Sequence, residues 1–226
     1  MAGGMNVRIR RLGAWTLVAA LVACLAAVAA AEELWFEDFE EAGAVGASPA
    51  GWEALVDMDA TVRLADVSSM GSPSGRMAVA LEDESFSLSS QVRRKLGAAL
   101  ERGAVEYLVL ISTEKPAEAY IEMRADNIGK VFDCHVSGGG NFKCRSNGSL
   151  LTLVEGMEIG VWHTIRLEWD TSSWTYRAAV NGRDVTPEGG LRFDQQGVPS
   201  EINFKVGSNP KTGQLAYVDA VRVVRM

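Results

Sequence analysis

Short runs of β-forming residues, each bounded by a cluster of turn-forming residues, recur through almost the whole chain after residue 31. Many short strands joined by tight turns are typical of two antiparallel sheets packed face to face. Residues 92–102 are the one segment that could instead be helical, although Gly97 weakens that interpretation. We therefore predict an all-β fold, an antiparallel two-sheet β-sandwich, with strands near residues 34–39, 61–64, 77–81, 86–92, 105–111, 120–124, 131–136, 141–145, 162–169, 174–180, 202–206 and 215–224.

The first 31 residues have the pattern of an export signal. Three arginines between residues 8 and 11 precede an uncharged stretch from 12 to 30, and three alanines stand before Glu32. This pattern predicts a signal peptide at residues 1–31 and a single domain at residues 32–226, secreted to an extracellular or periplasmic space. The alternative is a lipoprotein anchored through Cys24, because Leu21-Val22-Ala23-Cys24 resembles a bacterial lipoprotein box. No later run is long and apolar enough to predict a membrane span.

The charge balance bears on the kind of partner. The chain has 226 residues and a formal net charge of -7 at pH 7, with 47% hydrophobic and 23% charged residues. These fractions describe a folded globular protein rather than a disordered one. Because phosphate binding needs clustered lysine and arginine, we do not expect nucleic acid to be a partner.

Residues 137–141 (SGGGN) contain the residue types that a tight chain reversal requires. A turn centred on the middle glycine places Cys134 opposite Cys144. Directly opposed strand residues have Cβ atoms about 4.5–5.5 Å apart, so small adjustments allow a bridge. With an export signal, this geometry predicts a disulfide, and two buried free thiols are the alternative. A zinc site using His135 is disfavoured, because the sequence offers no second Cys/His pair.

Residues 162–180 predict a second hairpin, which ends in the strong turn signal Asn181-Gly182. Closing its turn around residues 170–173 pairs Trp169 with Trp174 on an apolar face. Aromatic residues here could stack on sugar rings, but opposed aromatics on alternating strands more often belong to the core. We therefore predict Trp162, Trp169 and Trp174 to be core residues.

The polar residues of the same hairpin give two further expectations. His163 shares the apolar face and is predicted to be a core or edge histidine with satisfied hydrogen bonds. In this register Arg166 lies opposite Arg177, a like-charged pair that needs a nearby acid or a bound anion. Glu168 is the expected partner of Arg166.

The run Trp162-His163-Thr164-Ile165-Arg166-Leu167, with Tyr176 and the following Asn-Gly turn, resembles the laminin-G-like jelly rolls of the concanavalin A-like lectin/glucanase superfamily. Residues 35–40 (WFEDFE) with Gly51-Trp52 resemble the opening strand of such secreted bacterial domains, and residues 213–223 resemble their closing strand. The resemblance covers nearly the whole mature chain and implies a jelly-roll sandwich. It leaves the activity open, because this fold hosts lectins, adhesion modules, glycosidases and lyases.

Two enzyme classes of the superfamily can be compared with the sequence. Laminarinase-type glycosidases carry the motif E-x-D-x-x-E, which is absent here, so this type of hydrolysis is not expected. Alginate-lyase-type enzymes use Arg, Gln, His and Tyr on a concave sheet to neutralise a uronate and abstract its proton. Their Q-I-H motif is also absent, and residues 203–207 resemble their Y-F-K-x-G motif only faintly. A lyase would use His135 as base, with Arg124 holding a carboxylate and Tyr120 nearby.

Polar and apolar residues alternate on the predicted strands 120–124, 131–136 and 141–145, so the polar side chains of each strand point to one face. If these strands are neighbours, their polar side chains share a surface. The plain interpretation is a solvated face of mixed charges, and the functional one is a ligand-binding face. The candidate ligand-binding residues are Tyr120, Glu122, Arg124, Asp133, His135, Lys143 and Arg145.

These observations favour a secreted, non-catalytic module that binds an extracellular or cell-surface polysaccharide. A lyase acting on a uronate polymer is the enzyme alternative, and it predicts that Tyr120, Arg124 and His135 converge in an open groove. A cell-envelope protein-interaction or structural module is the third hypothesis, and it predicts a flat or filled face without sugar affinity.

The resemblance also implies a structural Ca²⁺. Similar secreted β-sandwich modules often hold Ca²⁺ between the opening Phe-Glu and the closing Asp, and Glu40 and Asp219 match those positions best. First and last strands of such sandwiches commonly pair, which would bring these acids together. Ca²⁺ takes about six to eight oxygen ligands, so two acids would serve as anchors. The alternative is a pair of surface acids near a strand end.

Overall fold

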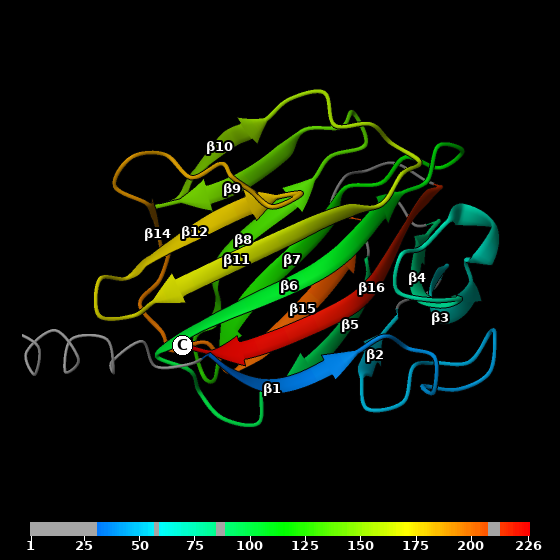
Figure 1. The fold of residues 1–226 in the computed structure, drawn as a ribbon, viewed down its shortest axis with the longest axis horizontal. Coiled ribbons are helices and arrows are strands. Elements are labelled where there is room, and N and C mark those ends of the chain that lie inside the picture. The colour runs from blue at the N-terminus through cyan, green and yellow to red at the C-terminus, as the bar shows by residue number, and fades with distance from the viewer. Residues whose placement is uncertain (1–30, 57–58, 85–88, 208–212) are drawn as a thin grey trace, which may run out of the picture.

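The computed structural model describes residues 31–56, 59–84, 89–207 and 213–226, which fold as two antiparallel sheets packed face to face (Figure 1). The predicted all-β sandwich is confirmed. In these ranges the helical structure is a single 3-10 turn, Ser68–Met70, so residues 92–102 are not a helix. The predicted export signal and Cys24 lie outside the described residues. Within the described ranges, no helix has the length and apolar character needed to cross a membrane.

One sheet has nine strands in the described ranges, with the order β13-β12-β11-β6-β16-β4-β3, and with β1 beside β16 and β14 beside β12. Its strands are β1 (Glu32–Glu37), β3 (Ala60–Asp66), β4 (Met77–Asp83), β6 (Arg102–Ile111), β11 (His163–Asp170), β12 (Thr175–Val180), β13 (Arg183–Asp184), β14 (Leu191–Arg192) and β16 (Gln214–Arg225).

The other sheet has seven strands in the same ranges, with the order β10-β9-β8-β7-β15-β5-β2. Each predicted strand overlaps a strand of the structure, while β2, β10, β13 and β14 were not predicted. The seven strands are β2 (Glu53–Leu55), β5 (Ser90–Lys95), β7 (Ala119–Ala125), β8 (Gly129–Val136), β9 (Phe142–Ser146), β10 (Ser149–Val154) and β15 (Glu201–Val206).

The core lies between the sheets because strand residues alternate between inward apolar and outward polar side chains. In β11, Ile165, Leu167 and Trp169 are buried, while the residues between them are half-exposed. Aromatic rings from the two sheets meet in this core, where Phe132 of β8 stacks on Tyr176 of β12 with ring centroids 4.2 Å apart. The two sheets are thus held by apolar contacts, and the outward faces are left free for polar chemistry.

The second hairpin supplies core residues as predicted. Trp169 is 3% exposed, and its indole N–H donates to a backbone carbonyl at 2.8 Å. Trp162 and Trp174 are half-buried and pack against the core. His163 is buried, and its Nε2 lies 2.7 Å from the carbonyl oxygen of Glu158, so its hydrogen bonding is satisfied.

The predicted register of this hairpin is wrong by two residues. Trp169 faces Tyr176 rather than Trp174, because Asp170 remains in β11 opposite Thr175. The Asp170 carboxylate accepts a hydrogen bond from the backbone N–H of Ser172 at 2.8 Å, which starts the turn one residue later than expected. Since the shift is even, every side chain keeps its predicted face.

The shifted register also changes the expected charge contacts. Arg166 lies opposite Ala179, so the predicted Arg166–Arg177 opposition is wrong, and Glu168 lies opposite Arg177 instead. The predicted partner of Arg166 is confirmed, because its Nε lies 2.7 Å from Glu168 Oε1.

The first hairpin has the predicted register and the predicted disulfide. Cys134 of β8 faces Cys144 of β9, and their sulfurs are bonded. Both cysteines are fully buried on the core side of the sheet. Because neighbouring strand residues point in opposite directions, Asp133 and His135 are directed to the outer side.

We expect the disulfide to contribute about 2–3 kcal/mol to the free energy of unfolding, because it closes a short loop and restricts the unfolded chain. The double variant Cys134→Ala/Cys144→Ala should therefore unfold at a lower guanidinium concentration than the oxidised protein. Reductant should lower the midpoint of the wild type and leave that of the variant unchanged. Equal midpoints for the oxidised and reduced wild type would contradict this expectation.

Candidate functional site

The outward side chains of the seven-stranded sheet form a continuous polar surface, which we call the polar face. The strand register places these side chains in rows that run across β5, β15, β7, β8 and β9. The polar face comprises Gln91, Arg93, Lys95, Tyr120, Glu122, Arg124, Asp133, His135, Lys143, Arg145, Glu201, Asn203 and Lys205.

All seven predicted ligand-binding candidates lie on the polar face, because β7, β8 and β9 are neighbours. Tyr120 faces His135, and His135 faces Lys143 on the next strand. That these residues contact a ligand remains a prediction. The outward residues of β5 and β15 were not predicted, although Glu201, Asn203 and Lys205 alternate with apolar residues in the way that would have identified them.

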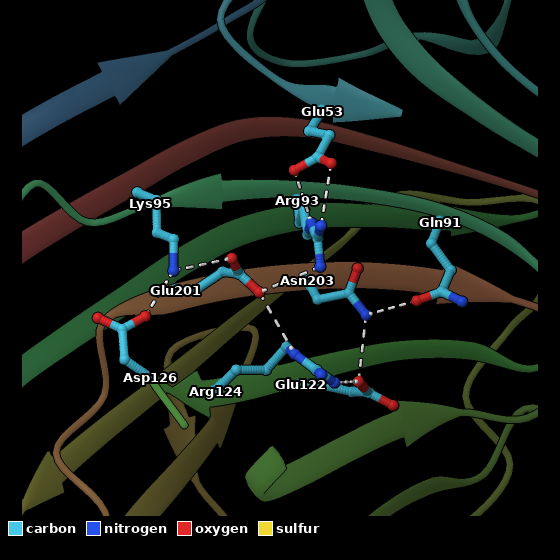
Figure 2. A network of polar contacts seen from close by, with 9 residues as sticks. All are labelled: Glu53, Gln91, Arg93, Lys95, Glu122, Arg124, Asp126, Glu201 and Asn203. Atoms are coloured by element: carbon cyan, nitrogen blue, oxygen red, sulfur yellow. Dashed lines mark hydrogen bonds and ion pairs between the residues drawn. The ribbon is translucent and has the colours of Figure 1, made fainter. Parts of the chain in front are cut away.

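Glu201 is the centre of an ion-pair network at one end of the polar face (Figure 2). Its carboxylate lies 3.3 Å from Lys95 Nζ, 3.3 Å from Arg124 Nε and 3.9 Å from Arg93 Nη1. Glu201 is only 7% exposed, and a carboxylate so buried needs cationic partners to offset the loss of water. Arg93 is also held at two points by Glu53, with N–O distances of 2.8 and 2.9 Å.

Asn203 connects this network to the middle of the sheet (Figure 2). Its Nδ2 donates to Gln91 Oε1 at 3.0 Å and to Glu122 Oε2 at 3.1 Å. The same Glu122 oxygen accepts a hydrogen bond from Arg124 at 2.9 Å. Asn203 is 1% exposed, so this amide fixes the relative positions of side chains from three strands.

Asp133 forms a second charged centre, on β8. It is 1% exposed and lies 2.7 Å from Lys130 Nζ and 3.2 Å from Arg145 Nε. Arg145 also lies 3.5 Å from Asp194. These cations are therefore already engaged by carboxylates.

Tyr120 and His135 form a ring pair at the other end of the face, with centroids 4.5 Å apart and planes inclined by 33°. The phenol of Tyr120 donates to Glu118 Oε2 at 2.7 Å, and Lys205 Nζ lies 5.9 Å from the Tyr120 ring centroid. His135 is 3% exposed, and burial lowers the pKa of its imidazole, against a smaller opposing effect of nearby carboxylates. The imidazole is therefore neutral at pH 7.

Three buried atoms of the polar face have no hydrogen-bond partner among the described residues: Asp133 Oδ2, His135 Nδ1 and Asn203 Oδ1. Leaving a buried polar atom without a partner costs about 1–3 kcal/mol, so such atoms are rare in native proteins. Their presence on one outward surface indicates a place where water or a polar ligand completes the hydrogen bonding.

The polar face is hollowed at both ends. One hollow, of about 270 Å³, lies beside the Glu201 network and is lined by Arg93, Lys95 and Arg124 among others. The other, of about 470 Å³, is lined by Glu118, Lys143 and the turn at residues 137–139 among others. A chain-like ligand could therefore occupy more than one position on this face.

The nine-stranded sheet also has a hollow on its outer side, of about 310 Å³. Its arginines are already neutralised, because Arg166 is paired with Glu106 and Glu168, and Arg177 with Asp184. This surface is a solvated face of matched charges, and the polar face is the stronger candidate site.

The groups that a lyase would need do not converge. Tyr120 and His135 are adjacent, but Arg124 is four residues further along β7, about 13 Å away at the usual rise per residue. Its guanidinium is engaged by Glu122 and Glu201. The structure thus keeps Arg124 away from the base that it would have to assist.

The two acids predicted to hold Ca²⁺, Glu40 and Asp219, lie where the first and last strands meet, since β1 pairs with β16. Glu40 Oε1 accepts hydrogen bonds from the backbone N–H groups of Arg76 and Met77, at 2.5 and 2.6 Å. Asp219 is fully buried and accepts hydrogen bonds from the hydroxyls of Ser72 and Ser74. Both acids therefore contact the segment that joins β3 to β4.

The electrostatics of Asp219 suit a hard cation. Burial raises the pKa of its carboxyl group, and the nearby Glu40 raises it further, against the hydrogen bonds that lower it. No lysine or arginine of the described ranges lies within 4 Å of Asp219, although buried carboxylates are normally paired or bound to metal. The oxygen donors, two carboxylates and two hydroxyls, fit Ca²⁺ in kind. The described residues contain no group of three or more His, Cys, Asp or Glu side chains arranged for a metal.

We expect the burial of His135 to make the fold acid-sensitive. The unfolded chain binds a proton near the ordinary pKa of about 6.5, while the folded chain resists it. The contribution of neutral, buried His135 to the free energy of unfolding is therefore present above that pKa and is lost as the pH falls toward 5.5. Urea unfolding at pH 7.5 and 5.5 should show a larger loss of stability for the wild type than for His135→Gln. An equal loss in both proteins would contradict this prediction.

No family model and no curated protein matches the sequence. Among solved structures, a sialidase matches with a TM-score of 0.64 and 16% identity over 78% of this chain. The chain spans only 17% of that sialidase's length.

Two further matches cover nearly whole chains. The cellulose induced protein Cip1 has a TM-score of 0.61 and 13% identity over 84% of this chain and 96% of its own. Domain 4 of an extracellular arabinanase from Geobacillus stearothermophilus, solved in complex with arabinotriose, has a TM-score of 0.52 and 14% identity over 86% of this chain and 93% of its own. At these identities, what the matches establish is that the chain has a β-sandwich fold shared with such proteins.

Proposed function

We propose that this chain is a non-catalytic, laminin-G-like module of the concanavalin A-like type that binds an extracellular glycan on its polar face. The observation that carries the proposal is the set of three buried, unpartnered polar atoms on that outward surface. Sugars carry many hydroxyl groups that both donate and accept hydrogen bonds. A glycan hydroxyl that displaces the side chains covering these atoms can therefore donate to Asn203 Oδ1 and can pair with His135 Nδ1 in either tautomer of the imidazole.

The structural neighbours support a carbohydrate-related role. They include a sialidase, an arabinanase domain in complex with arabinotriose, and a protein described among endo-acting O-glycanases that initiate mucin breakdown. The separation of Arg124 from Tyr120 and His135 favours binding over the lyase reaction. Export remains part of the proposal, and the disulfide between Cys134 and Cys144 supports it, because such bonds persist in oxidising compartments.

Affinity electrophoresis tests the proposal. The purified protein is run through gels that contain neutral or acidic polysaccharides, and we expect retardation in at least one of them. The double variant His135→Ala/Asn203→Ala should bind that polysaccharide about tenfold more weakly, because it loses two hydrogen-bonding groups of the polar face.

The matched control is Arg177→Ala, which removes a polar side chain from the opposite sheet and should leave binding unchanged. Circular dichroism confirms that each variant is folded. Unretarded migration of the wild type in every gel would overturn the proposed function. It would favour instead a structural or protein-interaction role in the cell envelope.

We also propose that Glu40 and Asp219, with the hydroxyls of Ser72 and Ser74, hold a structural Ca²⁺. The ion would neutralise two acids and tie the last strand to the segment between β3 and β4, so binding would stabilise the fold. Saturating Ca²⁺ should raise the melting temperature of the wild type above its value in chelator.

Asp219→Asn separates this effect from nonspecific ion binding. It should abolish the Ca²⁺ response, and in chelator it should be at least as stable as the wild type, since it removes a buried charge whose pKa is raised by burial. A melting temperature that does not respond to Ca²⁺ in the wild type would contradict the site.

A further inference from the structure

Nearly all cations of the described ranges are neutralised by carboxylates within 4 Å. The exceptions in those ranges are Lys143, Arg183, Arg192 and Lys205. The two arginines are exposed to water on the nine-stranded sheet, where an unpaired charge costs little. The two lysines differ, because both are half-buried and both belong to the polar face. Lys205 Nζ has the Tyr120 ring near it, 5.9 Å away, but neither lysine has a carboxylate of the described ranges within 4 Å. Such an ammonium group can form charge-assisted hydrogen bonds with an anionic ligand.

The strand register places both lysines in one row. Lys205 of β15 lies opposite Tyr120 of β7, Tyr120 lies opposite His135 of β8, and His135 lies opposite Lys143 of β9. We call this row the lysine row. Its ends are three strand spacings apart, about 14 Å. The two rings between them carry no charge at neutral pH, because burial keeps His135 neutral.

Of the acids beside this row, Asp133 is paired with Lys130 and Arg145. Glu118 accepts a hydrogen bond from the phenol of Tyr120 and keeps its negative charge, and it borders the same hollow as Lys143. The hollow of about 470 Å³ opens at the Lys143 end and is bordered by the turn at residues 137–139. A Cβ added at Gly139 would meet nothing closer than 3.9 Å, so the space beside this residue is open, whereas one added at Gly138 would meet Pro116 at 3.1 Å.

We infer that the glycan bound by the polar face is anionic, a polymer with carboxylate or sulfate groups on spaced sugar units, which Lys143 and Lys205 recognise at the two ends of the lysine row. The inference rests on the proposed function and names its ligand class. Two separated cations on a protein whose net charge is -7 favour a ligand with discrete, spaced charges over a densely charged nucleic acid.

The test compares ligands that differ only in charge. Binding of the whole protein to polygalacturonate is measured beside binding to the same polymer after reduction of its carboxyl groups. Dextran sulfate beside dextran provides the second pair and distinguishes sulfate from carboxylate recognition. We expect tight binding to the acidic member of at least one pair and weak binding to its neutral counterpart.

Alanine variants test whether the lysine row is responsible for the preference for acidic polymers. Lys143→Ala and Lys205→Ala should each weaken binding to the acidic polymer about tenfold, and the double variant should reduce it to the level of the neutral polymer. Arg183→Ala and Arg192→Ala are matched controls, because each removes an unpaired cation outside the polar face, and they should bind like the wild type. Circular dichroism establishes that each variant is folded.

The failure of this inference differs from the failure of the proposed function. If acidic and neutral polymers bind equally and the lysine variants bind like the wild type, glycan binding stands and the anionic preference is wrong. If Arg183→Ala weakens binding as much as Lys143→Ala, a diffuse charge effect replaces the lysine row. If no polymer of either pair binds while another polysaccharide gel retards the protein, the anionic preference is wrong and the proposed function stands. If no polysaccharide binds in either experiment, both fail.

Discussion

The register of β8 between β7 and β9 is the constraint on which the candidate site depends. Phe132 and Cys134 point into the core, where one stacks on Tyr176 and the other forms the disulfide. The pleat then leaves Asp133 and His135 no direction except outward. Core packing and covalent bonding on one side of the strand therefore position the polar chemistry on the other side, and they do so without any contact to the ligand.

The polar face combines two kinds of electrostatic environment. Around Glu201 and Asp133, each buried carboxylate is surrounded by cations, so these centres are balanced and serve to organise the surface. Around Tyr120 and His135 the described residues form no such ion pairs, because the flanking Lys143 has no carboxylate within 4 Å, although Glu118 borders the same hollow. Rigid, neutralised networks beside a row without such ion pairs are what a binding surface requires, since preorganised neighbours reduce the entropy lost on binding.

Local sequence signals predicted the parts of the fold that depend on local geometry. The glycine-rich turn at residues 137–141 determined the pairing of Cys134 with Cys144, and alternation identified the outward residues of β7 to β9. The position of the turn after Trp169 was mispredicted, because a side chain–backbone hydrogen bond from Ser172 to Asp170 decides it. The Glu201 network was missed, since pairing of β5 with β15 joins residues more than a hundred positions apart. β10 (SLLTLV) lacks polar alternation and so gave no strand signal.

The alternation of inward and outward residues on β8 also has an evolutionary consequence. Substitutions at outward positions such as His135 or Lys143 change the chemistry of the proposed binding surface while the core and the disulfide stay intact. An insertion of a single residue within the strand would instead exchange the two sides and bury the polar residues. The fold therefore tolerates point mutations at outward positions and changes in turn length, whereas an odd-numbered change in strand length disrupts the core.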